Sequence, residues 1–361
     1  MADLAVLTNP NLQKKVVENF LNGASLPYYV LSNNPVEYSA STFDKVVKYK
    51  SSAVGGAFNG LAQFNRTQID AEVRLAFNSR QEYEPIVLDQ VQLDKNANDP
   101  KASVKIEGYQ VDRAGRELIS RVGTRLYGIG GTADTTTGNA GIVMEGLRTI
   151  DDDGTDNDTI GSLSRTTYTA LKSQYLAAGA TLSSGNVANI DTYLNNATFN
   201  TDAPTHIFTT QALFGIYAAL ITQTQYTNPT MISATNSGRA GVGDQIQGYA
   251  ANVGWESLYV RGRAMIADRN CPSTYMFFLN LKNQDALVWA GLKSSEEGAT
   301  NLTLGDTQLM GPWGKFGADN LGLTLRKSMM SPNQYGKSTD ILLMGCLMSF
   351  EPRLLAKIKW A

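Results

Sequence analysis

Within residues 67–77, apolar side chains stand at every second position from residue 69 onward. A two-residue period places the apolar side chains on one face of a strand, so a half-buried strand is predicted here. A turn at residues 78–80 and an apolar run at 84–93 follow, and the three segments together predict a β-hairpin. The alternating apolar residues are Ile69, Ala71, Val73, Leu75 and Phe77.

Residues 100–127 show a longer period, because their apolar side chains recur three, four or seven positions apart. This spacing predicts one apolar stripe along a helix of about seven turns, at 3.6 residues per turn. Asp99 is a suitable N-cap and Pro100 suits the first helical position, so the helix is expected to begin there. The stripe consists of Val104, Val111, Ala114, Leu118, Val122 and Leu126.

The second half of the chain mixes both periods. A helix is predicted at 186–197, a strand at 203–210 and another helix at 211–223, which indicates a layered α/β arrangement. Residues 261–289 predict a hairpin, with its second strand at 275–279, that leads into a helix beginning at Asn283.

Two further strands are predicted near the C-terminus, at 341–350 and 356–360, where Glu351 and Pro352 separate them. We expect these strands to return to a sheet that begins much earlier in the chain.

Composition and charge narrow the possible functions. Lys and Arg number 31 against 33 Asp and Glu, a net charge of -2, which argues against a protein that grips DNA or an anionic membrane. No apolar run approaches the roughly 18 residues of a membrane span. The N-terminus lacks the pattern of a secretory signal. Cys271 and Cys346 are interpreted as free thiols made in a reducing cytoplasm.

Few residues could carry catalysis or hold a metal. A Ser-His-Asp arrangement would have to use His206, the single histidine, for which a structural role is predicted instead. His206, Cys271 and Cys346 lack the spacing of zinc ligands. The acidic run at 151–158 lacks EF-hand spacing, which favours a solvated turn over a calcium site. We therefore predict no catalytic, cofactor-binding or metal-binding residue.

Five sequence blocks follow one another in an informative order. They are the Gly-rich stretch with its strands at 45–95, the helix at 100–127, GLRTIDDDGTDNDTIGSLSRTTY, APTHIFTTQALFGIYAALI and RGRAMIADRNCPSTYMFFLNLKNQDALVW. In this order they resemble the major capsid proteins of tailed phages with the Hong Kong 97 fold, over about residues 45–360. The third block carries the resemblance at Gly146, Leu147, Asp153, Gly154, Thr155, Gly161, Ser164 and Arg165, and the fourth at Pro204, Thr209 and Thr210.

The resemblance implies an α+β, Hong Kong 97-like capsid fold in five parts. These are an N-terminal arm at 1–44, an extended E-loop hairpin with flanking strands at 45–95, a long spine helix and peripheral domain at 96–221, an axial domain at 222–320, and C-terminal strands at 321–361 that rejoin the peripheral and axial sheets. Aromatic residues of the arm and the loop have little local core to enter. The residues expected at inter-subunit contacts are Tyr28, Tyr29, Phe58, Phe64 and Arg66.

The implied function is a structural protein of the virion and not an enzyme. As a major capsid protein made in the host cytoplasm, it would assemble into pentamers and hexamers of an icosahedral shell around the double-stranded DNA genome of a bacteriophage. Expected partners are other copies, a portal and a separate scaffolding protein, since the arm-like sequence begins at Met1. A decoration protein is left open. No cofactor or membrane is expected, and packaged DNA would be contacted only weakly and non-specifically. The alternatives are an encapsulin-type cellular shell protein and a soluble hydrolase.

Overall fold

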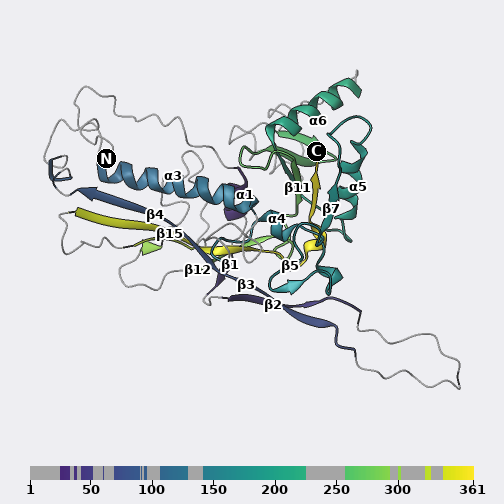
Figure 1. The fold of residues 1–361 in the computed structure, drawn as a ribbon, viewed down its shortest axis with the longest axis horizontal. Helices are drawn as coiled ribbons and strands as arrows, with labels where there is room; N and C mark the ends of the chain where they lie inside the picture. Colours follow the sequence, from purple (N-terminus) through teal and green to yellow (C-terminus); the bar gives the residue numbers. More distant parts are fainter. Residues whose placement is uncertain are drawn as a thin grey trace, which may run out of the picture.

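The computed structural model describes residues 25–32, 36–38, 42–51, 60, 69–89, 91, 93–95, 106–128, 141–224, 257–292, 300–301, 322–326 and 336–361. Two six-stranded sheets, two two-stranded ribbons and several helices make up these parts. Figure 1 shows an elongated arrangement, with one long helix and two long strands reaching to one end and the second sheet with two helices at the other. None of the described helices is long and apolar enough to cross a membrane.

The first six-stranded sheet has the order β1-β12-β15-β14-β13, and β4 pairs with the other part of β15. The long strand β15 pairs with β4 from Gly336 to Gly345 and with β12 from there to Met348, so it belongs to both halves of the sheet. The strands are β1 (Val36–Tyr38), β4 (Arg80–Asp89), β12 (Val288–Leu292), β13 (Thr300–Asn301), β14 (Leu323–Leu325) and β15 (Gly336–Met348).

The long helix α3 (Ile106–Tyr127) lies along β4 and β15 (Figure 1). Its predicted apolar stripe is buried from Ala114 to Leu126, with Leu118, Val122 and Leu126 all 0% exposed, whereas Val111 is partly buried and Val104 lies outside the described residues. Ile86 and Leu88 of β4 pack into the same core. The predicted helix is therefore confirmed from Ile106 onward, whereas its predicted start at residues 99–100 lies outside the described residues.

The predicted hairpin over residues 67–93 is wrong, although its strands exist. β3 (Glu72–Asn78) pairs with β2 (Thr42–Lys48) in a two-stranded ribbon, and β4 pairs with β15. Only Ser79 separates β3 from β4. A hairpin loop commonly has at least two residues, so the chain bends at Ser79 and changes sheet instead of reversing. The alternation within β3 is confirmed, because Leu75 and Phe77 are buried while the charged Glu72 and Arg74 are exposed.

The second six-stranded sheet has the order β7-β16-β11-β8-β10-β9. Its strands are β7 (Gln174–Ala177), β8 (His206–Thr209), β9 (Ser257–Val260), β10 (Arg263–Ala267), β11 (Tyr275–Leu279) and β16 (Ala356–Lys359). The predicted helices at 186–197 and 211–223 are present as α5 (Ala188–Asn196) and α6 (Gln211–Thr224), and they contribute to the core beside this sheet. These strands come from four distant parts of the chain. A boundary between the peripheral and axial domains at residues 221 and 222 would therefore divide this sheet.

Two predictions for residues 261–289 are wrong. Strands β10 and β11 do not form a hairpin, because the fully buried strand β8 lies between them, parallel to β10 and antiparallel to β11. The predicted helix at Asn283 is a turn that leads into β12. The Asn283 side chain accepts a hydrogen bond from the Asp285 N–H, and such local side-chain bonds compete with helix formation.

The C-terminal prediction is confirmed. Strand β15 returns to pair with β4, and β16 inserts between β7 and β11. A single 3₁₀ turn, η5 (Pro352–Leu354), separates the two strands, as the Glu351–Pro352 break predicts.

The short helix α1 (Ser25–Ser32) is held at its N-terminus by a buried carboxylate from another part of the chain. The Leu26 N–H donates to Asp268 Oδ2 at 2.8 Å, and the Tyr127 hydroxyl donates to the same oxygen at 3.1 Å. A carboxylate here satisfies a free helix N–H and favours the positive end of the helix dipole. Asp268 therefore joins α1, the end of α3 and the second sheet.

Candidate assembly surfaces and a buried ionic cluster

Strand β4 exposes apolar side chains on the face that does not contribute to the core with α3. Tyr83 is 60% exposed and Val87 is 72% exposed, and Pro85 between them is also exposed. At the strand edge, Arg121 of α3 pairs with Glu84 and donates to the Tyr83 carbonyl, which fixes the strand against the helix. The exposed stripe of Tyr83, Pro85 and Val87, here called the β4 outer face, is thus presented by a rigid support.

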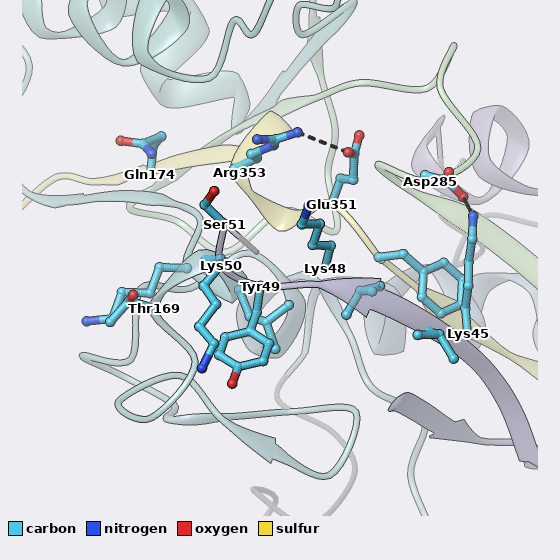
Figure 2. Close-up of a pocket in the computed structure, with 16 residues that line it drawn as sticks. Lys45, Lys48, Tyr49, Lys50, Ser51, Thr169, Gln174, Asp285, Glu351 and Arg353 are labelled. Atoms are coloured by element: carbon cyan, nitrogen blue, oxygen red, sulfur yellow. Dashed lines mark hydrogen bonds and ion pairs between the residues drawn. The ribbon is translucent and has the colours of Figure 1, made fainter. Parts of the chain in front are cut away.

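A groove of about 810 Å³ lies at the root of the β2–β3 ribbon (Figure 2). Residues 45–51 form one wall, and the segments at 169–174 and 350–353 form the other. Its charged lining consists of Lys45, Lys48, Lys50, Lys172 and Arg353 against Asp285 and Glu351. Five basic side chains against two acidic ones make the groove electropositive.

Several of these charges already have partners. Lys45 pairs with Asp285, and Arg353 donates to Glu351 at 3.1 Å (Figure 2). The Lys50 ammonium lies 5.0 Å from the centre of the Tyr49 ring. None of the described residues lining the groove is His or Cys.

The segment between α4 (Leu147–Ile150) and the 3₁₀ turn η3 (Thr169–Leu171) is organised around the fully buried Arg165. Its guanidinium donates to five backbone carbonyls, those of Thr149, Ile150, Asn157, Thr159 and Leu171, at 2.6 to 3.3 Å. Arg165 was one of the family-like residues in the sequence, and its role here is to hold this loop together.

Two glycines of the same segment adopt backbone conformations that favour glycine. Gly154 has φ +102° and Gly161 has φ +49°, in the region that favours glycine. A Cβ at Gly161 would also lie 2.7 Å from Leu75 of the β2–β3 ribbon. The block therefore sets local backbone geometry.

The acidic run was expected to be a solvated turn, and this is wrong for its first two members. Asp151 and Asp152 are both 0% exposed. Asp152 pairs with Lys357 of β16, whose side chain is also 0% exposed and whose ammonium donates to the Arg148 carbonyl at 3.2 Å. Buried charges persist when they are paired and hydrogen-bonded, and residue 357 supplies that partner from the other end of the sequence. Asp153 is half-buried, Asp156 is exposed, and no group of potential metal ligands was found among the described residues.

Two further buried carboxyl groups near Arg165 have strongly raised pKa values. Burial raises the pKa of Asp151 to about 7, although Lys357 acts in the opposite direction. Burial also raises the pKa of Glu145 to about 7, against the nearby positive charges of Arg165 and Arg80. These groups change charge near neutral pH because solvent cannot stabilise their ionised forms.

His206 is 7% exposed at the start of β8 and packs against aromatic rings. Its ring centre lies 5.0 Å from that of Tyr29, and its Nδ1 shares a 2.9 Å hydrogen bond with the Thr205 hydroxyl. Burial lowers its pKa to about 4. This environment agrees with the predicted structural role. Cys271 and Cys346 are buried free thiols, as their interpretation from the sequence required.

The residues predicted at inter-subunit contacts are distributed unevenly. Phe58, Phe64 and Arg66, together with the side chain of Tyr28, lie outside the described residues. Tyr29 is 8% exposed and packs against His206 and Phe208 of its own chain, so little of its ring is available to a neighbour.

Sequence reasoning missed the β4 outer face and the Lys357 pair. The residues EPIVLDQVQL contained a signal for the first, because apolar residues stand at consecutive positions and therefore on both strand faces. The second had no local signal, because the partners are separated by 205 positions.

No family model and no curated protein matches the sequence. Solved structures do match. The capsid asymmetric unit of cyanophage A-1(L) aligns over 98% of this chain and 97% of its own, at a TM-score of 0.69 and 15% identity. The capsid of a native GTA particle aligns over 100% and 97%, at a TM-score of 0.57 and 12% identity. The holo-SrpI encapsulin complex from Synechococcus elongatus PCC 7942 aligns over 99% and 95%, at a TM-score of 0.51 and 12% identity. The chain thus has the Hong Kong 97-like capsid fold that its sequence blocks indicate.

Proposed function

We propose that this chain is the major capsid protein of a tailed phage and that its copies assemble, as pentamers and hexamers, into an icosahedral shell around double-stranded DNA. The observation that carries the proposal is the alignment with the cyanophage capsid unit over nearly the whole of both chains. The β4 outer face supports it independently, because exposed apolar patches commonly mark protein contacts.

The β4 outer face is the proposed binding surface for the E-loop of a neighbouring copy. From Lys45 to Ile69, both included, the sequence has four basic residues and no acidic one, and it carries Phe58 and Phe64. The β4 outer face presents the apolar Tyr83 and Val87, with the exposed Asp89 at the end of the strand. The aromatic and basic residues of the loop therefore match the apolar and acidic residues of this face.

The remaining proposed contacts are Tyr28 on the arm and Arg66 on the loop. Tyr29 is left out of this set because its ring packs inside its own subunit. We assign α3 with the first sheet to the peripheral domain and the second sheet with α5 and α6 to the axial domain. A separate scaffolding protein and a portal would complete the assembly, and a decoration protein is left open. The net charge of -2 suits a wall that contacts DNA only weakly.

A cellular shell of the encapsulin type is the second candidate, because an encapsulin also aligns over 99% of the chain. The TM-score of 0.69 for the phage capsid against 0.51 for the encapsulin favours the phage shell. A hydrolase acting through His206 is disfavoured, since that ring is buried against Tyr29 and Phe208.

Negative-stain electron microscopy of the purified chain tests the proposal, with the chain expressed alone and with the product of a neighbouring scaffold-like gene. Closed shells or ring-shaped capsomers are expected. A monomer under every condition would contradict the shell function. Shells that form without a scaffold and enclose a cellular protein would support the encapsulin alternative instead.

A further inference from the structure

The carboxyl group of Asp152 is held differently from that of an ordinary ion-pair partner. Its Oδ2 contacts the Lys357 ammonium. Its Oδ1 accepts hydrogen bonds from the N–H groups of Gly154 at 2.7 Å and of Asp156 and Asn157 at 3.3 Å. Convergent backbone donors on one oxygen are the arrangement that stabilises the oxyanion of a tetrahedral intermediate in acyl transfer.

A third group, the carboxyl of Asp151, lies beside this pair. It is 0% exposed and interacts electrostatically with both Lys357 and Asp152. The Ser173 hydroxyl faces it, yet neither carboxyl oxygen has a partner of regular hydrogen-bond geometry among the described residues. A buried acid without a fixed partner, next to an amine and a carboxyl group, is suited to proton transfer between them.

We propose that Lys357 and Asp152 become joined by an intramolecular isopeptide bond after the chain has folded, with Asp151 as the proton-transfer group. The proposal concerns the isolated subunit and does not rest on the proposed shell function.

The reaction balances without any co-reactant. Asp151 takes one proton from the Lys357 ammonium and passes it to Oδ2 of Asp152, and the neutral Nζ then attacks Cγ of the resulting carboxylic acid. Oδ1 carries the single negative charge of the tetrahedral intermediate under its three N–H donors. The nitrogen gives up a second proton, this proton also reaches Oδ2 through Asp151, and Oδ2 leaves as water while Oδ1 becomes the amide oxygen. One C–N bond forms and one C–O bond breaks, so an ammonium and a carboxylate become an amide and a water molecule.

Burial favours the product over the ion pair. The Lys357 and Asp152 side chains are both 0% exposed, and the Tyr175 ring centre lies 4.5 Å from Nζ. Removing two charges from such a site removes their desolvation cost, while the exclusion of water disfavours hydrolysis of the new amide. The bond would fasten β16 to the turn after α4, across 205 sequence positions.

The mass of the intact full chain under denaturing conditions tests the proposal. Folded wild-type protein is expected to be lighter than its sequence by one water molecule. Trypsin cuts after Arg148, Arg165 and Arg353, and an acylated Lys357 resists cleavage. The digest should therefore contain one branched peptide that joins residues 149–165 to residues 354–359.

Controls separate this reaction from other losses of water. Asp153–Gly154 could close to a succinimide of the same mass change, but residues 149–165 would then remain a linear peptide. Lys357→Met should abolish the mass loss, whereas Lys359→Met, two positions along the same strand, should retain it. Wild-type protein of unmodified mass with both linear peptides would overturn the proposal, even if the Lys357→Met variant failed to fold.

Discussion

The buried charged residues Arg165, Asp152 and Lys357 and the β4 outer face depart in opposite directions from the usual placement of polar and apolar side chains. The three charged side chains are completely buried, whereas Tyr83 is 60% exposed and Val87 is 72% exposed. The buried charges find hydrogen-bond partners in their own chain, but the exposed apolar side chains lack a cover among the described residues. The contrast separates what one subunit completes by itself from what we propose a second copy completes.

Replacing Arg165 by Ala should produce the largest effect on the isolated subunit. The change removes donors to five carbonyls and leaves buried carboxylates without their positive neighbour, which predicts a loss of about 3–5 kcal/mol in the free energy of unfolding. Urea denaturation measures it. Arg261→Ala is the control, because its pair with Asp191 is exposed and should cost less than about 1 kcal/mol. Equal losses in both variants would contradict the role assigned to Arg165.

The double variant Tyr83→Asp with Val87→Asp should show the opposite pattern. Subunit stability should change by no more than about 0.5 kcal/mol, because both side chains are exposed. Assembly should fail, since each contact would lose about 1.5–3 kcal/mol per apolar side chain and gain a buried charge. Sedimentation and electron microscopy measure assembly. Ile142→Asp, at a similarly exposed position, is the control. Normal shells from the double variant would remove the β4 outer face from the proposed contacts.

Asp151→Asn should change how stability depends on pH. The folded pKa of Asp151 is raised to about 7, so the folded state binds its proton more tightly than the unfolded state, whose value is 3.8. The contribution of Asp151 to the free energy of unfolding is therefore complete below the unfolded pKa and is lost as pH rises through about 7. The denaturation midpoint of wild type should decrease from pH 5 to pH 8, and that of the variant should decrease less. An unchanged pH profile would show that Asp151 does not titrate in this range.

His206→Gln should act on the pH profile with the opposite sign. Burial lowers the folded pKa of His206 to about 4 from 6.5, so the unfolded state binds the proton more tightly. The stability associated with the neutral ring is present above about pH 6.5 and is lost as pH falls towards 4. The variant should lose less stability than wild type between pH 7 and pH 4.5. Thermal denaturation at both values checks this, with Asp151→Asn as the contrasting variant.

Lys45→Ala should have the smallest effect. Its pair with Asp285 is half exposed, at 47% and 46%, so the cost should be less than about 1 kcal/mol and should fall at high salt. Urea denaturation in low and high salt measures it. A cost comparable to that of Arg165→Ala would mean that the groove contributes to the stability of the single subunit.

Local pattern predicted the elements much better than their pairing. The stripe through Leu118 and Val122 gave α3, and alternation at Leu75 and Phe77 gave β3, because both signals depend on neighbours within a few positions. Both predicted hairpins failed, since β8 enters between β10 and β11 and β15 takes the place beside β4. Sequential strands often pair, and these two exceptions depend on strands encoded far away.

The ionic cluster shows the same limit at the level of single side chains. Three consecutive aspartates look solvated when Lys357 is not known to lie beside them. The order of the family-like blocks nevertheless indicated the fold correctly, because it records the whole chain and not one segment. Residues of the β4 outer face could have been recognised from Ile86, Val87 and Leu88, whose consecutive apolar side chains must occupy both faces of a strand.

Strand β15 gives the subunit a particular mechanical character. Its hydrogen bonds to β4 run from Gly336 to Gly345, and those to β12 continue to Met348 without a break in the backbone. In an antiparallel ladder these bonds stand perpendicular to the strands. A tensile load along β15 is therefore shared by many hydrogen bonds at once. If copies of the chain form a closed shell as proposed, such a strand would transmit tension through the wall of that shell.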